Sequence, residues 1–394
     1  MARRFSAHRK SATGLTRRSI SEGRLPLILW LLCLPLSSAA QVNPRGAGFG
    51  IETNLAAGRV LKHTSKFRAP VPPVSTAVEL NFIQHTYGRQ RWHRSRHFPV
   101  PGFGVTYTNY GIDSIYGRCV SFYPNLQFLL VHGKRLEWTL RAGFGGGFVT
   151  RHYERAPSWD TLNNAIGSRL NNFTTFATDL RYRLSDHLDL QAGANFSHIS
   201  NAAFRQPNLG VNMCGGHIGV RYYPVTSRVV KSEYDPPPLR RRWLAQARLG
   251  LTANESGSAD GPLYPVYLAS VYASRRWHSY NKLLIGFDYS YHSRIYAFLR
   301  NNEILPGEEK KNAWKGSAFI GNEFLFGRFG VVLQVGVYLK NAYLRLAPYY
   351  EKLGGNIYIL QRERGIVKEL FGSALLKTHL TQAEMAEFGI GVGF

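Results

Sequence analysis

The sequence predicts an all-β fold: an antiparallel transmembrane β-barrel of the outer-membrane type with about sixteen strands, and any number from about 12 to 16 fits the pattern. First, short segments of alternating apolar and polar residues recur along the 394-residue chain, and no helical period accompanies them. Second, no apolar stretch of about twenty residues follows residue 40, so we expect no transmembrane helix. Third, tight turns alternate with long polar loops, as periplasmic turns alternate with extracellular loops in such barrels.

The candidate strands, in chain order, are 47–57, 76–86, 102–110, 116–131, 135–149, 173–184, 187–200, 213–224, 243–253, 265–275, 280–293, 314–326, 329–340, 354–361, 369–378 and 384–394. Their alternation leaves one apolar face, which favours membrane insertion. In the last segment, for example, Phe388, Ile390 and Phe394 share one face and glycines occupy the other. A secreted, soluble β-protein is the alternative, and it requires polar outward faces.

The chain divides into four parts. Residues 1–40 read as a signal peptide, because a basic segment precedes an apolar core at 25–36 and then small residues; an N-terminal anchor helix is the alternative. Residues 41–225 supply about eight strands and form the first β-barrel region. A Pro- and Arg-rich connection follows at 226–242, and residues 243–394 either complete the barrel or form a second β unit.

The formal net charge of +25 also limits the partners. An exported protein rarely meets nucleic acid, so we expect no nucleic-acid partner and look instead to anionic lipid headgroups or lipopolysaccharide phosphates. A solvated surface of basic loops explains the charge equally well. Cys119 and Cys214, which follow the signal segment, have no metal-ligand spacing, and their redox state stays open.

One strand carries the main candidate for chemistry. In 188–200 the apolar residues on one face, from Leu188 to Phe196, give way to His198 and Ser200 on the same face. This is the seventh candidate strand. If the chain starts in the periplasm, this strand ends at the extracellular side, and its apolar face contacts lipid.

A histidine beside a serine can perform acyl transfer. The histidine takes the serine proton, and the serine oxygen attacks an ester carbonyl. Backbone N–H groups after Ser200, together with Asn201 or Asn208, are candidates for an oxyanion hole. A histidine and a serine two residues apart also occur often without function, so the spacing alone does not distinguish this site from a structural histidine near a loop.

A longer string strengthens the catalytic interpretation. His198–Ala202, followed by Gln206–Gly210, resembles the signature of the lipid A deacylase family of outer-membrane barrels (PagL-like, also called acyloxyacyl hydrolases), and the close resemblance spans 160–225. It implies an ester hydrolase that removes the 3-linked acyl chain of lipid A, with its active site on the lipid-facing wall of an eight-stranded barrel. It also implies that His198 is the general base and Ser200 the nucleophile.

The resemblance places Asn201, Ala202 and Asn208 in the oxyanion and substrate-binding region. It has one departure: the family's third catalytic residue is a glutamate, and this chain has Asn212 at that position. Asparagine can fix the imidazole tautomer but cannot neutralise an imidazolium. Asp179 and Glu52 are the candidate replacements for the missing acid.

Two functions therefore follow from the sequence. The first is an outer-membrane serine esterase acting on lipid A, in lipopolysaccharide or a related acylated glycolipid, that requires no metal and no cofactor. The second is a non-catalytic barrel, such as a porin, transporter or structural protein, with a degenerate site. The direction in which His198 and Ser200 point distinguishes them.

Overall fold

The computed structural model describes residues 43–394, apart from 156–159, 233–240, 256–258, 279 and 381. The expected signal peptide, residues 1–40, lies outside the described residues, as does part of the connection at 226–242. In the part that is described, no helix is both long and apolar enough to cross a membrane.

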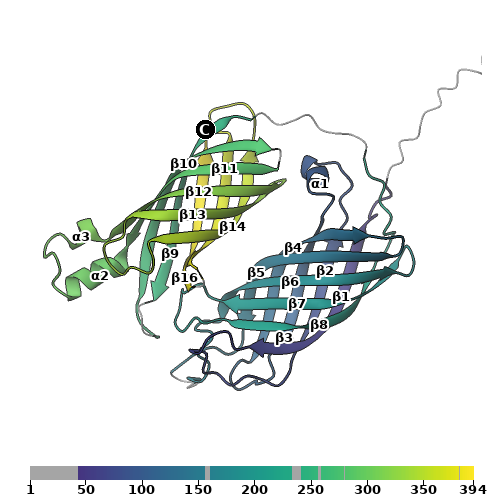
Figure 1. Ribbon diagram of the computed structural model, residues 1–394, viewed down its shortest axis with the longest axis horizontal. Helices are drawn as coiled ribbons and strands as arrows, with labels where there is room; N and C mark the ends of the chain where they lie inside the picture. The colour runs from purple at the N-terminus through teal and green to yellow at the C-terminus, as the bar shows by residue number, and fades with distance from the viewer. Residues whose placement is uncertain (1–42, 156–159, 233–240, 256–258, 279, 381) are drawn as a thin grey trace, which may run out of the picture. The chain divides into compact units, whose positions relative to one another are not determined.

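Within the described residues the strands form two closed antiparallel barrels of eight strands each. The first (purple to teal in Figure 1) contains β1 (Phe49–Leu61), β2 (Ser75–Gln84), β3 (Val100–Asn109), β4 (Arg118–His132), β5 (Leu136–Val149), β6 (Leu170–Arg183), β7 (Leu188–Ser200) and β8 (Val211–Tyr222). The second (green to yellow) contains β9 (Trp243–Glu255), β10 (Leu263–His278), β11 (Asn281–His292), β12 (Trp314–Phe326), β13 (Phe329–Lys340), β14 (Tyr349–Gln361), β15 (Glu369–His379) and β16 (Gln382–Gly393).

Closure depends on two pairings between strands that are distant in sequence. In the first barrel β8 returns to β1, with Ile51 opposite Tyr222. In the second, β16 returns to β9, with Phe388 opposite Leu251. The predicted all-β fold and the predicted number of strands are confirmed, and the strands close as two barrels rather than as one.

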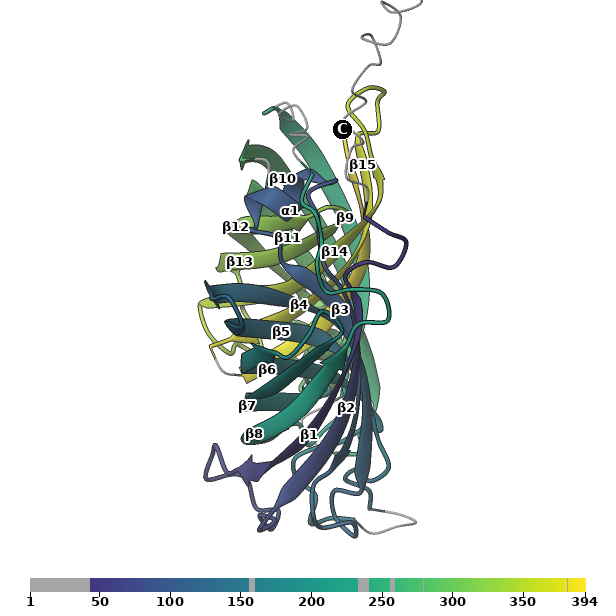
Figure 2. The same ribbon diagram turned by 90° about the vertical axis from the view of Figure 1, so that its right-hand side faces the viewer.

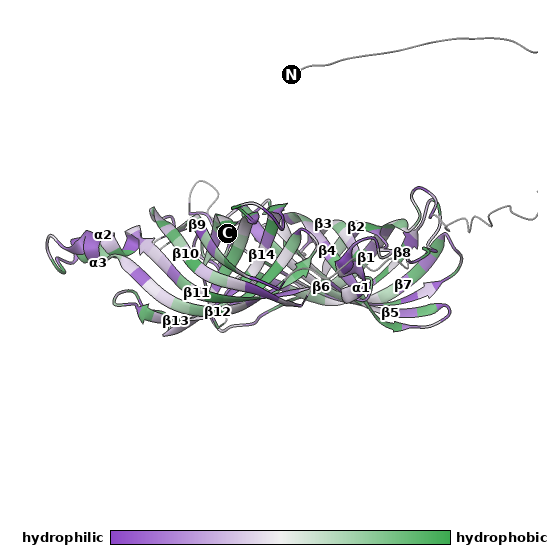
Figure 3. Cartoon of the chain, turned by 90° about the horizontal axis from the view of Figure 1, so that it is seen from above, coloured by the Kyte–Doolittle hydropathy of each residue, from purple (hydrophilic) through white to green (hydrophobic). Residues whose placement is uncertain are grey.

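The strands of the first barrel lie side by side, as Figure 2 shows from a second direction. Their side chains alternate between the inside and the outside of the barrel, and the hydropathy colours alternate accordingly along the strands in Figure 3. Large apolar side chains face outward from the first barrel, for example Leu55, Phe122 and Leu180, which are more than half exposed. An outward apolar belt of this kind is what a lipid-embedded barrel requires.

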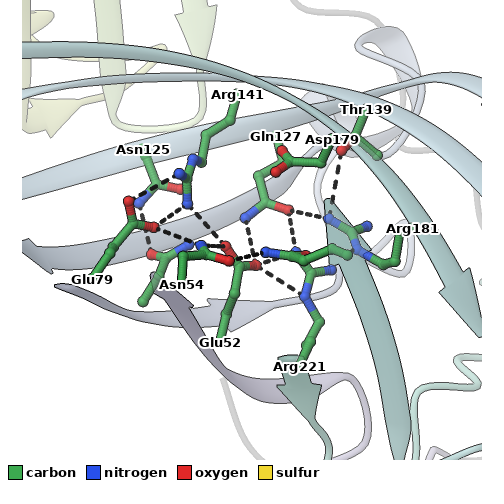
Figure 4. Close-up of polar contacts among 12 residues, drawn as sticks. Glu52, Asn54, Glu79, Asn125, Gln127, Thr139, Arg141, Asp179, Arg181 and Arg221 are labelled. Atoms are coloured by element: carbon green, nitrogen blue, oxygen red, sulfur yellow. Dashed lines mark hydrogen bonds and ion pairs between the residues drawn. The ribbon is translucent and has the colours of Figure 1, made fainter. Parts of the chain in front are cut away.

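The interior of the first barrel is filled by a charged network (Figure 4). The buried carboxylate of Glu52 accepts hydrogen bonds from Arg141 at 2.9 Å and from Arg221 Nε at 3.0 Å. Arg141 also donates to Glu79 at 3.0 Å, and Gln127 donates to Glu52 at 3.4 Å. Because Glu52 and Glu79 have arginine partners, these buried charges are compatible with a folded barrel.

The second barrel is filled in the same way. Lys352 lies between Asp288, at 2.8 Å, and Glu387, at 3.0 Å, and Arg248 binds the same Glu387 at 2.9 Å. Tyr350 adds a hydrogen bond to Asp288 at 2.6 Å. Ion pairs between buried side chains therefore occur inside both barrels.

An even number of strands makes the chain enter and leave each barrel at one end, which we call the entry end. Short turns lie there, such as 133–135 and 327–328; a longer connection with helix α1 (Arg91–Ser95) joins β2 to β3. The opposite end, the loop end, carries the longer connections. One of these holds helices α2 (Ser293–Asn301) and α3 (Glu309–Asn312).

At the loop end of the first barrel, four loops pack into an apolar core. Phe67, Tyr116 and Ile166 come from three different loops, and Ile199 reaches the same core from β7. Burial raises the pKa of the Tyr116 phenol, which therefore stays neutral. The core fixes the loops around the end of β7, where the candidate residues lie.

Candidate active site

Strand alternation turns His198 and Ser200 to the outer face of the first barrel. Ile199 lies between them and is 1% exposed in the core under the loops, so its two neighbours must face the other way. His198 pairs with Asn212 of β8 on one side and with Thr174 of β6 on the other. Both residues therefore stand on the outer wall, at the loop end.

The geometry brings three of the sequence candidates into one chain of hydrogen bonds. Nε2 of His198 lies 2.9 Å from Oγ of Ser200, and Nδ1 lies 2.6 Å from Oδ1 of Asn212. An amide oxygen only accepts hydrogen bonds, so Nδ1 carries the ring proton. Nε2 of the neutral ring is then free to accept the hydrogen bond, and later the proton, of the serine hydroxyl.

Neither candidate replacement for the missing acid reaches the histidine. Asp179 faces the barrel interior and binds Nε2 of His217 at 2.6 Å. Glu52 is held by Arg141 and Arg221 in the same interior. The side chain that binds Nδ1 of His198 is therefore Asn212.

The loop after β7 arranges further hydrogen-bond donors. The backbone N–H of Asn201 donates to Oδ1 of Asn208 at 2.8 Å, which fixes that amide and leaves its NH₂ group as a donor. Ala202 and Ala203 have φ values of 54° and 62°, a conformation that costs energy for residues other than glycine. Among the described residues their backbone N–H groups have no hydrogen-bond partner, and neither does the buried side-chain nitrogen of Asn201.

Sequence reasoning missed Gly210, which supports the histidine ring. Its φ of +77° suits glycine, and a Cβ at this position would lie 2.5 Å from Cε1 of His198. Its N–H donates to the carbonyl oxygen of Ala165 at 2.8 Å. His63 holds the preceding residue through a 3.0 Å contact between Nε2 and the carbonyl oxygen of Leu209. The glycine that follows Pro207 and Asn208 in the signature was the available signal.

A second loop supports the first. Oδ1 of Asn164 accepts hydrogen bonds from the backbone of Arg68 and Ala69, at 3.0 and 3.1 Å, and its Nδ2 donates to the carbonyl oxygen of Lys66 at 2.6 Å. Asn163 donates to the carbonyl oxygen of Ile115 at 2.9 Å. These two asparagines tie three loops together beneath the candidate site, and such support holds the outer residues in place.

The second barrel shows that a serine–histidine contact is not sufficient for a site. Ser290 Oγ lies 2.9 Å from Nε2 of His292, the distance found for His198 and Ser200. Both residues, however, are buried inside the barrel, at 5% and 6% exposure. His198 and Ser200 lie instead on the outward face of β7, where Ser200 is 8% exposed, so the two pairs differ in the face of the barrel that they occupy and not in the burial of the serine. Cys119 and Cys214 are both free, and the described residues contain no cluster suited to a metal ion.

Comparisons with known proteins fit this description. Residues 76–221 match the family model for lipid A 3-O-deacylase (PagL). Residues 241–394 match the model for the C-terminal domain of acyloxyacyl hydrolase. A search of curated proteins found no match.

Among solved structures, the outer membrane enzyme PagL is 17% identical, with a TM-score of 0.30 over 42% of this chain and 97% of its own. Neisserial surface protein A is 15% identical, with a TM-score of 0.31 over 45% of this chain and 97% of its own. A mutant of the Rh. blastica porin is 8% identical, with a TM-score of 0.17 over 88% of this chain and 99% of its own.

The two family matches lie one in each barrel and together cover most of the chain. The protein belongs to the PagL-type family of lipid A 3-O-deacylases and acyloxyacyl hydrolases.

Proposed function

We propose that the protein is an outer-membrane ester hydrolase that removes an acyl chain from lipid A or a related acylated glycolipid, with Ser200 as the nucleophile and His198 as the general base. The observation that carries the proposal is the hydrogen-bonded series Asn212–His198–Ser200 on the outward wall of the first barrel. The family of the chain supports the reaction class.

The reaction follows the usual course of a serine hydrolase. Nε2 of His198 accepts the proton of Ser200 as Oγ attacks the ester carbonyl carbon. The imidazolium then returns this proton to the departing sugar oxygen, which leaves as an alcohol. Water, deprotonated by the same nitrogen, hydrolyses the acyl-enzyme and releases a fatty acid.

The loop after β7 suits the charge that develops on the carbonyl oxygen. The backbone N–H groups of Ala202 and Ala203 and the side-chain NH₂ of Asn208 are donors without partners among the described residues. Preorganised donors of this kind stabilise the oxyanion without the cost of reorganising solvent. We assign them, with Asn201, to the oxyanion hole.

The outer wall suits the acyl chain. From His198 toward the entry end, the outward positions of β7 are Phe196, Ala194, Ala192 and Leu190. Ile218 of the neighbouring β8 is 65% exposed on the same face. An acyl chain in the outer leaflet would lie along this surface with its ester at the level of Ser200.

The non-catalytic alternative requires an open lumen if the protein is a porin or transporter. Paired charges fill the interior of both barrels, including Glu52 with Arg221 in the first and Lys352 with Glu387 in the second. These packed interiors weigh against transport through the barrels and favour a reaction on the outer wall.

Mass spectrometry of lipid A from cells that express the protein tests the proposal. We expect loss of one acyl chain with the intact protein and no loss with Ser200→Ala or His198→Ala. Ser290→Ala is the matched control, because it removes the serine of the buried pair in the second barrel and should leave deacylation unchanged. Intact lipid A in cells whose outer membrane contains the folded protein would refute the assignment.

A further inference from the structure

The entry end of the second barrel contains a cavity of about 280 Å³ with an excess of positive charge. Arg242, Arg276, Lys282 and Arg362 line it, against Glu363 and Glu369. The cavity opens where β10 and β14 end and β11 and β15 begin. The cavity lies in the second barrel, whereas Ser200 lies in the first, so the proposed hydrolysis makes no use of the cavity.

The basic side chains differ in how many of their donors are already used. Lys282 is saturated, because Tyr358, Glu369 and Glu323 accept from it or pair with it within 3.3 Å. Within the described part of the chain, Arg276 has a single polar contact, at 3.4 Å with Glu369. Arg362 donates through Nε to the carbonyl oxygen of Val367 at 2.6 Å. Two guanidinium groups therefore keep N–H donors for another acceptor.

A buried hydroxyl gives independent evidence for a missing acceptor. Ser274 is 1% exposed and lines the same cavity. Its Oγ has no hydrogen-bond partner among the described residues. A buried polar group without a partner lowers stability, and an oxygen atom of a ligand in the cavity would remove this cost.

We propose that this cavity binds a phosphate group, either as the free ion or on a phosphate ester. Arginine forks match the geometry of phosphate oxygens and can bind them in pairs. Here the guanidinium groups of Arg276 and Arg362 and the hydroxyl of Ser274 line the same cavity. Three donor groups suit a tetrahedral group with three free oxygens better than a planar carboxylate with two. The second barrel would thus have a binding function of its own.

Calorimetric titration of the full-length protein in detergent tests the proposal, with inorganic phosphate as the probe at constant ionic strength. We expect saturable binding by the natural sequence and a loss of affinity of about tenfold in Arg276→Gln, because a charge-assisted fork is lost. Arg275→Gln is the matched control. It removes the same charge one residue away, where the side chain stacks on Trp243 at 5.6 Å on the outer face.

Arg362→Gln keeps the test decisive if Arg276→Gln misfolds, since Arg362 lies on an exposed turn. We expect it also to weaken phosphate binding. No saturation with the natural sequence, or an equal loss in Arg275→Gln, would overturn the proposal.

Lipid nanodiscs distinguish the two sources of the phosphate. With a phospholipid headgroup as the natural ligand, discs that contain phosphatidic acid should compete with added phosphate, whereas discs of phosphatidylcholine alone should not. Equal phosphate affinity in both kinds of disc would still support a phosphate site in this cavity, and it would indicate that the natural ligand is a soluble phosphate ester.

Discussion

At the scale of single residues, the central question is whether an asparagine can serve where the family has a glutamate. Asn212 fixes the neutral tautomer through its 2.6 Å contact with Nδ1 of His198. It carries no charge, so the imidazolium formed during the reaction lacks a counter-ion. The proposed hydrolase should therefore be intrinsically slow, and its rate should respond to the charge at this position.

Asn212→Glu should accelerate ester hydrolysis by about tenfold or more, because a carboxylate stabilises the imidazolium in the transition state. Initial rates on a short-chain p-nitrophenyl ester in detergent would measure this. Asn212→Ala, which loses the contact without gaining charge, should be slower than the natural sequence. A glutamate variant that folds and is no faster would show that the charge does not limit the rate.

The support of the histidine ring by Gly210 leads to a second prediction. In Gly210→Ala the new methyl group would stand 2.5 Å from Cε1 of the ring and displace it from Ser200. A displacement of about 1 Å can cost about a hundredfold in rate. Hydrolysis rates of the purified variant would check this.

Gly307→Ala is a control that introduces the same kind of backbone strain as Gly210→Ala but no clash with a neighbouring side chain. Gly307 has a similar φ of +83°, but a Cβ there meets no atom within 4 Å. We expect this control variant to keep full activity. Equal activity of both variants would contradict the proposed role of Gly210.

At the scale of elements, alternation alone located the strands well. The predicted segments 187–200, 314–326 and 329–340 agree with β7, β12 and β13 within one residue at each end. The start of β14 is less well predicted: the structure begins it at Tyr349 and the sequence analysis at residue 354. The hairpin of β7 and β8 explains why Asn212 meets His198, because their register places the two side chains opposite each other on one face.

The loop end shows what alternation could not predict. The hydrogen bond between Asn201 and Asn208, the left-handed Ala202 and Ala203, and the short helices α2 and α3 depend on contacts between loops that are distant in sequence. Period-two patterns contain no information on such contacts. The family signature marked the residues of this loop, but not how they are arranged.

The outer face of β1 yields a prediction on substrate choice. Arg59 is exposed there, between Ala57 and Leu61, and it forms no ion pair with the other described residues. Arg59 pairs in register with Cys214 of β8, which is two residues from Asn212 and therefore on the same face of that strand. An outward arginine near the membrane interface is well placed to meet a lipid phosphate.

Arg59→Gln should raise KM for a phosphorylated acylated glycolipid by about fivefold and leave KM for a neutral p-nitrophenyl ester unchanged, because one charge-assisted contact is lost. Arg118→Gln is the control: Arg118 is the first residue of β4 and is paired with Asp113 at 2.5 Å. A similar rise in KM for both substrates would instead indicate that Arg59 has a structural role.

At the scale of the whole molecule, the sequence pattern could not separate one large barrel from two small ones. Alternation within strands is the same in both arrangements, and the difference depends on which distant strands pair. Here β8 returns to β1 over eleven paired positions, from Ile51–Tyr222 to Leu61–Asn212. The first barrel consequently has no free strand edge, and such an edge is what would require a partner.

This closure leads to the last prediction, that a chain ending at residue 232 folds and is active without the second barrel. The strands and the loop-end core of the first barrel all lie between residues 49 and 222, and so do His198, Ser200 and Asn212. After refolding in detergent, the shortened chain should show the heat-dependent gel mobility of a closed barrel and hydrolyse a p-nitrophenyl ester at about the full-length rate. A folded but inactive fragment would instead assign the second barrel a part in the reaction itself.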